Sequence, residues 1–122
     1  MTPGKTGIAR IIAATGHSIN GMKACWEHEA AYRQDVVLSV VLFIASFFAA
    51  KSASQWLLLV LPLLLLIIVE SLNSAIEAVV DRIGVEYHDL SGRAKDAASA
   101  AVFFCLCTIG LSWAAILWTN FA

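Results

Sequence analysis

The sequence has few charged residues, which make up only 14% of its 122 positions, whereas soluble domains average about 25%. Hydrophobic residues make up 60%, more than a soluble domain of this size could bury. The net charge is −1, so the chain lacks the basic field that binds nucleic acid. The composition therefore excludes a nucleic-acid-binding module and indicates an integral membrane protein.

Cysteine is scarce as well, and its count is odd. Cys25, Cys105 and Cys107 are the three cysteines, and the last two point to nearly opposite sides of one helix, which favours small apolar packing over a disulfide or metal site. Two familiar signatures are incomplete: GKT at 4–6 lacks the glycine and strand that precede a P-loop, and HEAAY at 28–32 lacks the second zinc-binding histidine. Neither motif predicts a function.

Charge is absent from three long segments, 36–50, 52–69 and 97–122. A membrane-spanning helix needs about 20 mainly apolar residues, so the first span must also recruit residues before position 36. We predict an all-α membrane protein, a single domain over 1–122, with spans at about 29–50, 53–83 and 92–119. The second helix, about 45 Å long, must extend beyond the hydrocarbon layer.

The basic residues are distributed unevenly around these spans. Seven of the eight precede the first span or lie between the second and third, and Lys51 alone lies between the first and second. The positive-inside rule then puts the N-terminus and the 82–95 loop in the cytoplasm and the C-terminus outside. The N-terminal residues lack the pattern of a signal peptide, so we expect the spans to direct insertion.

Residues 5–27 are predicted to form an amphipathic helix on the membrane surface. The same pattern also suits a helix that packs on the bundle, and the two interpretations are compatible. Gly16 and Gly21 are positions at which the helix could divide in two. Further along, Gly84 is a suitable end for the second span, and Ser91 is a suitable N-cap for the third. The apolar face consists of Ile8, Ile11, Ile12, Ile19, Met22 and Trp26.

A row of polar residues follows the apolar run of the second span. In a helix, Glu70, Asn73, Ser74, Glu77 and Asp81 share one face. Ionisable groups at the edge of a membrane are functional by default, because hydrocarbon disfavours them. Carboxylates with an amide can hold Mg²⁺, which shares itself with substrate phosphates, and a carboxylate here can act as a general base.

All nine acidic residues fall on the predicted cytoplasmic side. On spacing alone, Asp81, Glu86 and Asp89 are expected only to carry surface charge. Lys95 on the third helix could hold a phosphate or could merely extend to the membrane surface. A non-enzymatic alternative is a membrane subunit in which Glu70 and Glu77 bind or conduct cations.

Several stretches together resemble the small prokaryotic diacylglycerol kinases. They are ARIIAATGHS near the start, EHEAAYRQD before the first span, and VESLNSAIEAVVDRIGVEYHDLSGRAKDAASAAV in the middle. The resemblance covers nearly the whole chain. It implies a homotrimer in the bacterial inner membrane, with active sites shared between subunits, that transfers the γ-phosphoryl group of ATP to diacylglycerol and forms phosphatidic acid.

The resemblance also implies roles for individual residues. Glu70 would be the general base on the lipid hydroxyl, Asn73 and Asp96 would support catalysis, and Mg²⁺ would be the cofactor. The sequence departs from the family pattern at His17, where the family has tyrosine, and at Asp35, where it has glutamate. The implied sets are Glu29 and Glu77 for the metal; Arg10, His17, Glu29, Glu77, Glu86, His88 and Lys95 for ATP; and Arg10, Glu70 and Ser99 for the lipid.

One rival enzyme remains from the same superfamily, a kinase that phosphorylates undecaprenol. It shares the polar row of the second span, and either alcohol would reach the same base. The segment GVEYHDLSGRAKD is more similar to the diacylglycerol branch. The sequence therefore favours diacylglycerol as the acceptor and leaves undecaprenol as the alternative.

Overall fold

The computed structural model describes Gly4 and residues 6–122. Within these residues the chain forms four helices and no strand, which confirms the all-α class. Lys5, at which the surface helix is predicted to begin, lies outside the described residues. The helices are α1 (Gly7–His28), α2 (Ala30–Ala49), α3 (Ala53–Ile83) and α4 (Asp89–Phe121).

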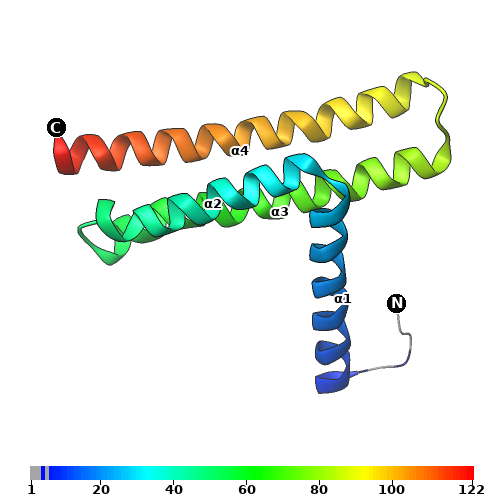
Figure 1. Cartoon of the computed structure of the whole chain (residues 1–122), viewed down its shortest axis with the longest axis horizontal. Helices are drawn as coiled ribbons and strands as arrows, with labels where there is room; N and C mark the ends of the chain where they lie inside the picture. Colours follow the sequence, from blue (N-terminus) through cyan, green and yellow to red (C-terminus); the bar gives the residue numbers. More distant parts are fainter. Residues whose placement is uncertain (1–3, 5) are drawn as a thin grey trace.

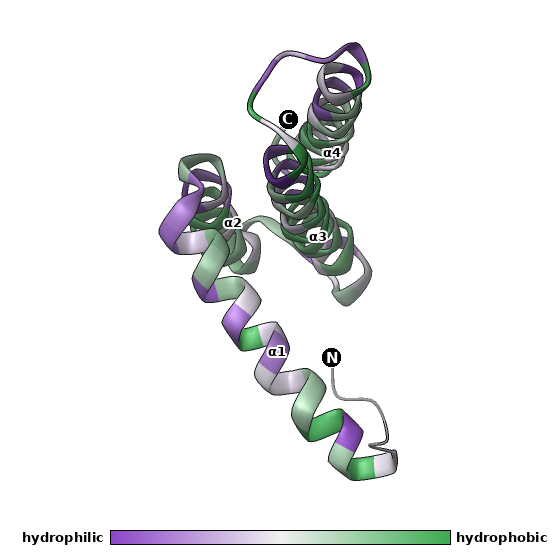
Figure 2. Cartoon of the chain, turned by 90° about the vertical axis from the view of Figure 1, so that its right-hand side faces the viewer, coloured by the Kyte–Doolittle hydropathy of each residue, from purple (hydrophilic) through white to green (hydrophobic). Residues whose placement is uncertain are grey.

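Helices α2, α3 and α4 run side by side, and α1 leaves them at a steep angle (Figure 1). Helix α3 is central, because it packs extensively against both α2 and α4, which scarcely touch each other. Three helices in the described part of the chain, α2, α3 and α4, are long and apolar enough to cross a membrane. Figure 2 shows hydrophobic residues along these three helices and polar residues along α1 and around the α3–α4 loop.

The core lies on one face of α3. Leu59, Leu63 and Leu66 are buried there at helical spacing, and Cys105 and Ile109 of α4 pack against the last two. The same face continues toward the C-terminal end of α3 with the buried polar residues Glu70 and Ser74. The apolar core and the polar row are therefore consecutive parts of one face of α3. Because the apolar part packs inward, the polar part of the same face also points inward.

The helix ends mostly follow their predicted chemistry. Gly84 ends α3, as predicted, with its amide bonded to the Val80 carbonyl. The N-cap of helix α4 is His88, three residues before the predicted cap Ser91, so that prediction is wrong. The Nδ1 atom of His88 accepts a hydrogen bond from the Leu90 amide at 3.1 Å. An acid in the first turn, Asp89, also favours the earlier start.

Helix α1 does not divide at Gly16 or Gly21, where the sequence allows a break, and it is continuous over 22 residues. A glycine inside a helix costs only about 1 kcal/mol relative to alanine. Neither position brings a competing cap or proline, so the helix continues through both.

At the end of the bundle remote from α1, Asn120 ties α4 to the turn between α2 and α3. Its Nδ2 atom donates to the Ala49 carbonyl at 2.8 Å and to Gln55 Oε1 at 2.7 Å. Its Oδ1 atom accepts a bond from Gln55 Nε2 at 3.1 Å. Lys51 Nζ donates to the Asn120 carbonyl at 2.9 Å. We call Lys51, Gln55 and Asn120 the end clasp.

Candidate active site

The polar row on α3 contains the most buried charged residue in the described part of the chain. Glu70 is 3% exposed, and its Oε2 atom is buried without a hydrogen-bond partner. One turn further on, Asn73 Oδ1 is also buried and unpartnered. Unsatisfied buried polar atoms are unfavourable and need a physical reason. Two neighbouring oxygen acceptors of this kind indicate a place where a ligand supplies the missing proton or cation.

Other acidic side chains converge on Glu70 from separate elements. Asp35 of α2 lies close enough for a side-chain hydrogen bond to Glu70 once one of the two carboxyls carries a proton. Glu77 of α3 and Glu29, between α1 and α2, are near enough to interact with it electrostatically. Carboxylates this close repel one another unless a proton or a cation separates them. The arrangement is therefore suited to binding a cation.

A basic residue completes the cluster from α4. Lys95 Nζ lies 2.8 Å from Asp81 Oδ1 across the α3–α4 gap, with the two side chains 41% and 63% exposed. The Lys95 ammonium also interacts electrostatically with Glu77 and Glu29. The sequence alone predicts only surface charge for Asp81, although its place one turn beyond Glu77 puts it on the same helix face. That spacing puts Asp81 in the polar row, whereas its pairing with Lys95 depends on how α3 and α4 pack.

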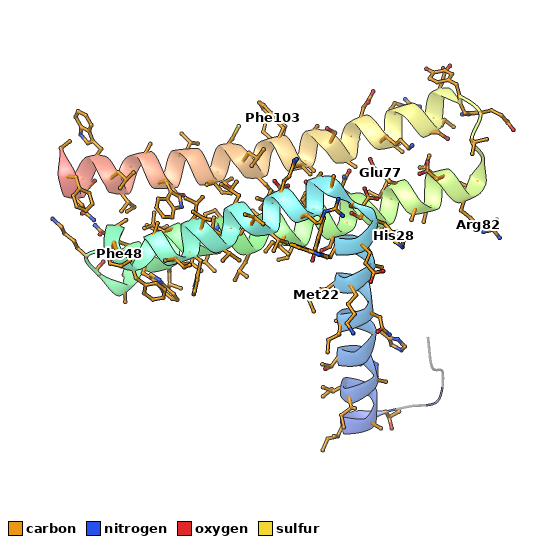
Figure 3. All side chains as sticks on the ribbon, viewed as in Figure 1. Met22, His28, Phe48, Glu77, Arg82 and Phe103 are labelled. Atoms are coloured by element: carbon orange, nitrogen blue, oxygen red, sulfur yellow. The ribbon has the colours of Figure 1, made fainter. Side chains whose placement is uncertain are left out.

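A cavity of about 540 Å³ lies between α1 and α3 and borders this cluster. Glu29 and Ser74 form part of its wall, together with small residues of both helices such as Gly21 and Ala78. Figure 3 shows His28 at the end of α1, close to the stretch of α3 that carries Glu77. The angle between α1 and the bundle thus creates space directly beside the acidic residues.

Two predicted nucleotide ligands are not brought to this cluster within one chain. Arg10 and His17 lie along α1, which runs away from α3 (Figure 1). At 1.5 Å per residue they are about 28 Å and 18 Å from Glu29 along the helix. The other predicted residues lie beyond the row: Glu86 is exposed in the α3–α4 loop, His88 caps α4, and Asp96 and Ser99 are exposed on α4.

The donor set fits Mg²⁺ better than a metal held by protein alone. Among the described residues, no three acidic, histidine or cysteine side chains come together as a metal site. Mg²⁺ usually takes one or two carboxylates and fills its other positions with water and substrate phosphate. Glu29 and Glu77, with the unpartnered oxygen of Asn73 between Glu70 and Glu77, offer ligands of this kind.

Three span-capable helices around a buried carboxylate define a multi-pass membrane protein with an acidic site at one end of its bundle. Comparison with known proteins identifies the family. A family profile described as prokaryotic diacylglycerol kinase matches residues 16–117, most of the chain. The chain belongs to the prokaryotic diacylglycerol kinase family, which makes it a phosphotransferase with an alcohol acceptor.

Curated relatives agree along almost the full length. A diacylglycerol kinase from Escherichia coli (strain K12) is 46% identical over 121 residues, 99% of each chain. One from Pseudomonas aeruginosa (strain PAO1) is 49% identical over 114 residues, 93% of each chain. One from Helicobacter pylori (strain 26695) is 38% identical over 121 residues, 99% of this chain and 91% of the relative. The resemblance seen in the sequence motifs is therefore confirmed.

Proposed function

We propose that this protein transfers the γ-phosphoryl group of MgATP to the hydroxyl of diacylglycerol, giving phosphatidic acid and ADP. The family and the names of the relatives support this activity. The single observation that carries the mechanism is Glu70, a carboxylate 3% exposed whose Oε2 atom has no partner. A base that is not already bonded can accept a proton from an incoming alcohol.

In the proposed reaction, Glu70 takes the proton of the lipid hydroxyl while the hydroxyl oxygen attacks the γ-phosphorus and ADP leaves. Asn73 stands one turn away and orients the reacting groups, and Asp96 supports catalysis from α4. Mg²⁺, when bound by Glu29 and Glu77, would neutralise phosphate charge. Lys95 adds a second positive charge from α4 after exchanging Asp81 for a phosphate oxygen. Phosphoryl transfer depends mainly on such positioning and charge neutralisation.

The two substrates reach the site from different phases. Glu70 lies where the apolar core of α3 gives way to polar residues, which is the depth at which a membrane lipid presents its hydroxyl. We place the N-terminus and the site on the cytoplasmic side, where ATP is available, and the C-terminus outside. Ser99 and Arg10 would contact the lipid, while Glu86, His88, Arg10 and His17 would contact the nucleotide.

We further propose that the working form is a homotrimer whose sites combine residues of two subunits. The distance of Arg10 and His17 from Glu29 supports this, because one chain cannot gather all the proposed ligands in this arrangement. The amphipathic α1, with exposed Ile8, Ile11 and Ile12, would lie on the membrane surface or against a neighbouring subunit.

Of the two alternatives, the relatives favour diacylglycerol over undecaprenol, since those compared carry the former name. Membership in a kinase family weighs against a non-enzymatic cation-binding subunit. The row of carboxylates and the buried base would be common to either kinase, so the acceptor has to be established by assay.

The test is transfer of labelled γ-phosphate from MgATP to lipid in mixed micelles, with diacylglycerol, undecaprenol or no lipid. We expect labelled phosphatidic acid from the wild type and none from Glu70→Gln, which removes the base but keeps the size of the side chain. Glu27→Gln, an exposed acid on α1, is the matched control and should remain active. Labelling of undecaprenol alone would refute the acceptor, and full activity of Glu70→Gln would refute the base.

A further inference from the structure

The chain breaks between α1 and α2 at a single residue. Glu29 has extended backbone angles, φ −122° and ψ 109°, and separates two regular helices. In an uninterrupted helix, the carbonyls of Trp26 and Glu27 would accept bonds from amides four residues further on. The break removes those partners from the end of α1, where carbonyls need other donors.

Arg33 supplies the replacement donor. Its Nη1 atom lies 2.6 Å from the Trp26 carbonyl oxygen and 3.4 Å from that of Glu27. The Cys25 carbonyl is already bonded to the Glu29 amide at 2.9 Å. A positive group at the C-terminal end of a helix also interacts favourably with the helix dipole. Arg33 thus links the first turn of α2 back to the last turn of α1 and stabilises the break.

The direction of α1 depends strongly on this junction. Helix α1 touches α2 and α3 far less than α3 touches its neighbours, and its N-terminal part extends away from the bundle (Figure 1). With little packing to hold it, the helix is directed by the chain at residues 28–33. The same junction carries Glu29, which interacts electrostatically with Glu70 and Lys95.

We propose that Arg33 is a positioning residue: by clamping the last carbonyls of α1, its guanidinium fixes the junction and holds the Glu29 carboxylate against α3. The inference rests on the proposed role of Glu29 as a ligand of Mg²⁺. It assigns to Arg33 no contact with substrate or metal. Lysine is a poor substitute, because a compact ammonium lacks the planar fork of guanidinium and is more strongly hydrated.

The test uses Arg33→Met, which keeps much of the length without the donors, and Arg33→Lys, which keeps the charge. Arg82→Met is the matched control, because Arg82 is an exposed arginine in the last turn of α3 that points away from the bundle in Figure 3. Activity is measured against Mg²⁺ concentration at saturating ATP and lipid. Groups that orient metal ligands typically contribute 10- to 100-fold to metal affinity. We expect Arg33→Met to need about tenfold more Mg²⁺ for half-maximal activity than the wild type, and to recover most of the maximal rate once Mg²⁺ saturates. The Mg²⁺ concentration for half-maximal activity should shift by an intermediate amount in Arg33→Lys and should not shift in Arg82→Met.

A second readout does not depend on catalysis. Spin labels at Ile12 of α1 and Val79 of α3, both exposed, report the angle of α1 by pulsed electron resonance. The three native cysteines are first replaced by alanine, and labelled protein is diluted into unlabelled protein so that distances within one chain dominate. We expect Arg33→Met to broaden the distance distribution and Arg82→Met to leave it unchanged.

The outcomes separate the two proposals. An unchanged Mg²⁺ dependence in Arg33→Met would overturn the positioning role, whether or not the distances broaden. An unchanged distance distribution would overturn the clamp. A wild type that phosphorylates no lipid would instead refute the proposed function, while the distance measurement would still decide whether Arg33 fixes the junction.

Discussion

The end clasp offers a stringent test of the packing, because one side chain contributes most of it. Asn120→Ala removes three hydrogen bonds: two donated by Nδ2 to the Ala49 carbonyl and Gln55 Oε1, and one accepted by Oδ1 from Gln55 Nε2. These bonds join the last turn of α4 to the end of α2 and the first turn of α3. Their loss should loosen the end of the bundle remote from Glu70.

The expected loss of stability follows from the measured strength of hydrogen bonds between membrane helices. Side-chain hydrogen bonds between membrane helices average about 0.6 kcal/mol each, so three of them give about 2 kcal/mol. The clasp is only partly buried, so water can bond to some of the groups that lose their partner. The loss of stability should therefore stay near that sum. Gln55 and Glu70 are about 22 Å apart along α3, so catalysis at low temperature should be unaffected.

Stability is measured by unfolding purified protein in mixed micelles with increasing denaturing detergent, and activity by lipid phosphorylation below the transition. Thr119→Ala is the control, since Thr119 is exposed and its hydroxyl bonds only within α4, to the Ala115 carbonyl at 2.8 Å. Asn120→Ala and Gln55→Ala should be strongly non-additive, because they remove shared bonds. Wild-type stability of Asn120→Ala, or additive losses in the double variant, would refute the reasoning.

Three further predictions concern the core and the site. Leu66→Ala should destabilise the protein by about 2–5 kcal/mol, because Leu66 is fully buried, whereas Leu65→Ala, on an exposed side chain, should have a much smaller effect in the same unfolding assay. Asp81→Asn should lower the KM for MgATP about two- to fivefold, since Lys95 then has no carboxylate to exchange for phosphate; an increased KM in steady-state kinetics would contradict this competition. Chelation of divalent ions should abolish lipid labelling and added Mg²⁺ should restore it; activity that survives chelation would remove the proposed role of Glu29 and Glu77.

The sequence was sufficient for features that depend on local patterns. Long uncharged runs predicted three span-capable helices, because hydrocarbon admits few other structures. Helical spacing placed Glu70, Asn73 and Ser74 on one face, and burial of Glu70 and Ser74 agrees with that face being turned inward. Gly84 ends its helix as expected, although its extended backbone angles, φ 176° and ψ 156°, are ones that any residue can adopt.

Features that depend on several helices at once were not accessible in the same way. Asp35 reaches Glu70 only because α2 packs beside α3 at one particular register. Lys95 pairs with Asp81 because the α3–α4 loop sets the register of the two helices. The role of Arg33 depends on where the chain breaks, and no glycine or proline marks that break at Glu29.

The position of Arg10 leads to a test of the shared site. In one chain, α1 carries Arg10 about 28 Å from Glu29, although the proposed mechanism needs both at the same nucleotide. If a neighbouring subunit supplies Arg10, a mixed trimer can form an intact site. That site combines Arg10 from a Glu70→Gln subunit with Glu70 from an Arg10→Ala subunit. We therefore expect Arg10→Ala and Glu70→Gln, each inactive alone, to recover part of the wild-type activity when unfolded and refolded together. Mixtures of Glu70→Gln with Asn73→Ala, two residues on the same turn of α3, should stay inactive, because no site then contains both. No recovery in the first mixture would mean that Arg10 and Glu70 act from one chain, and that α1 must turn through a large angle to bring them together.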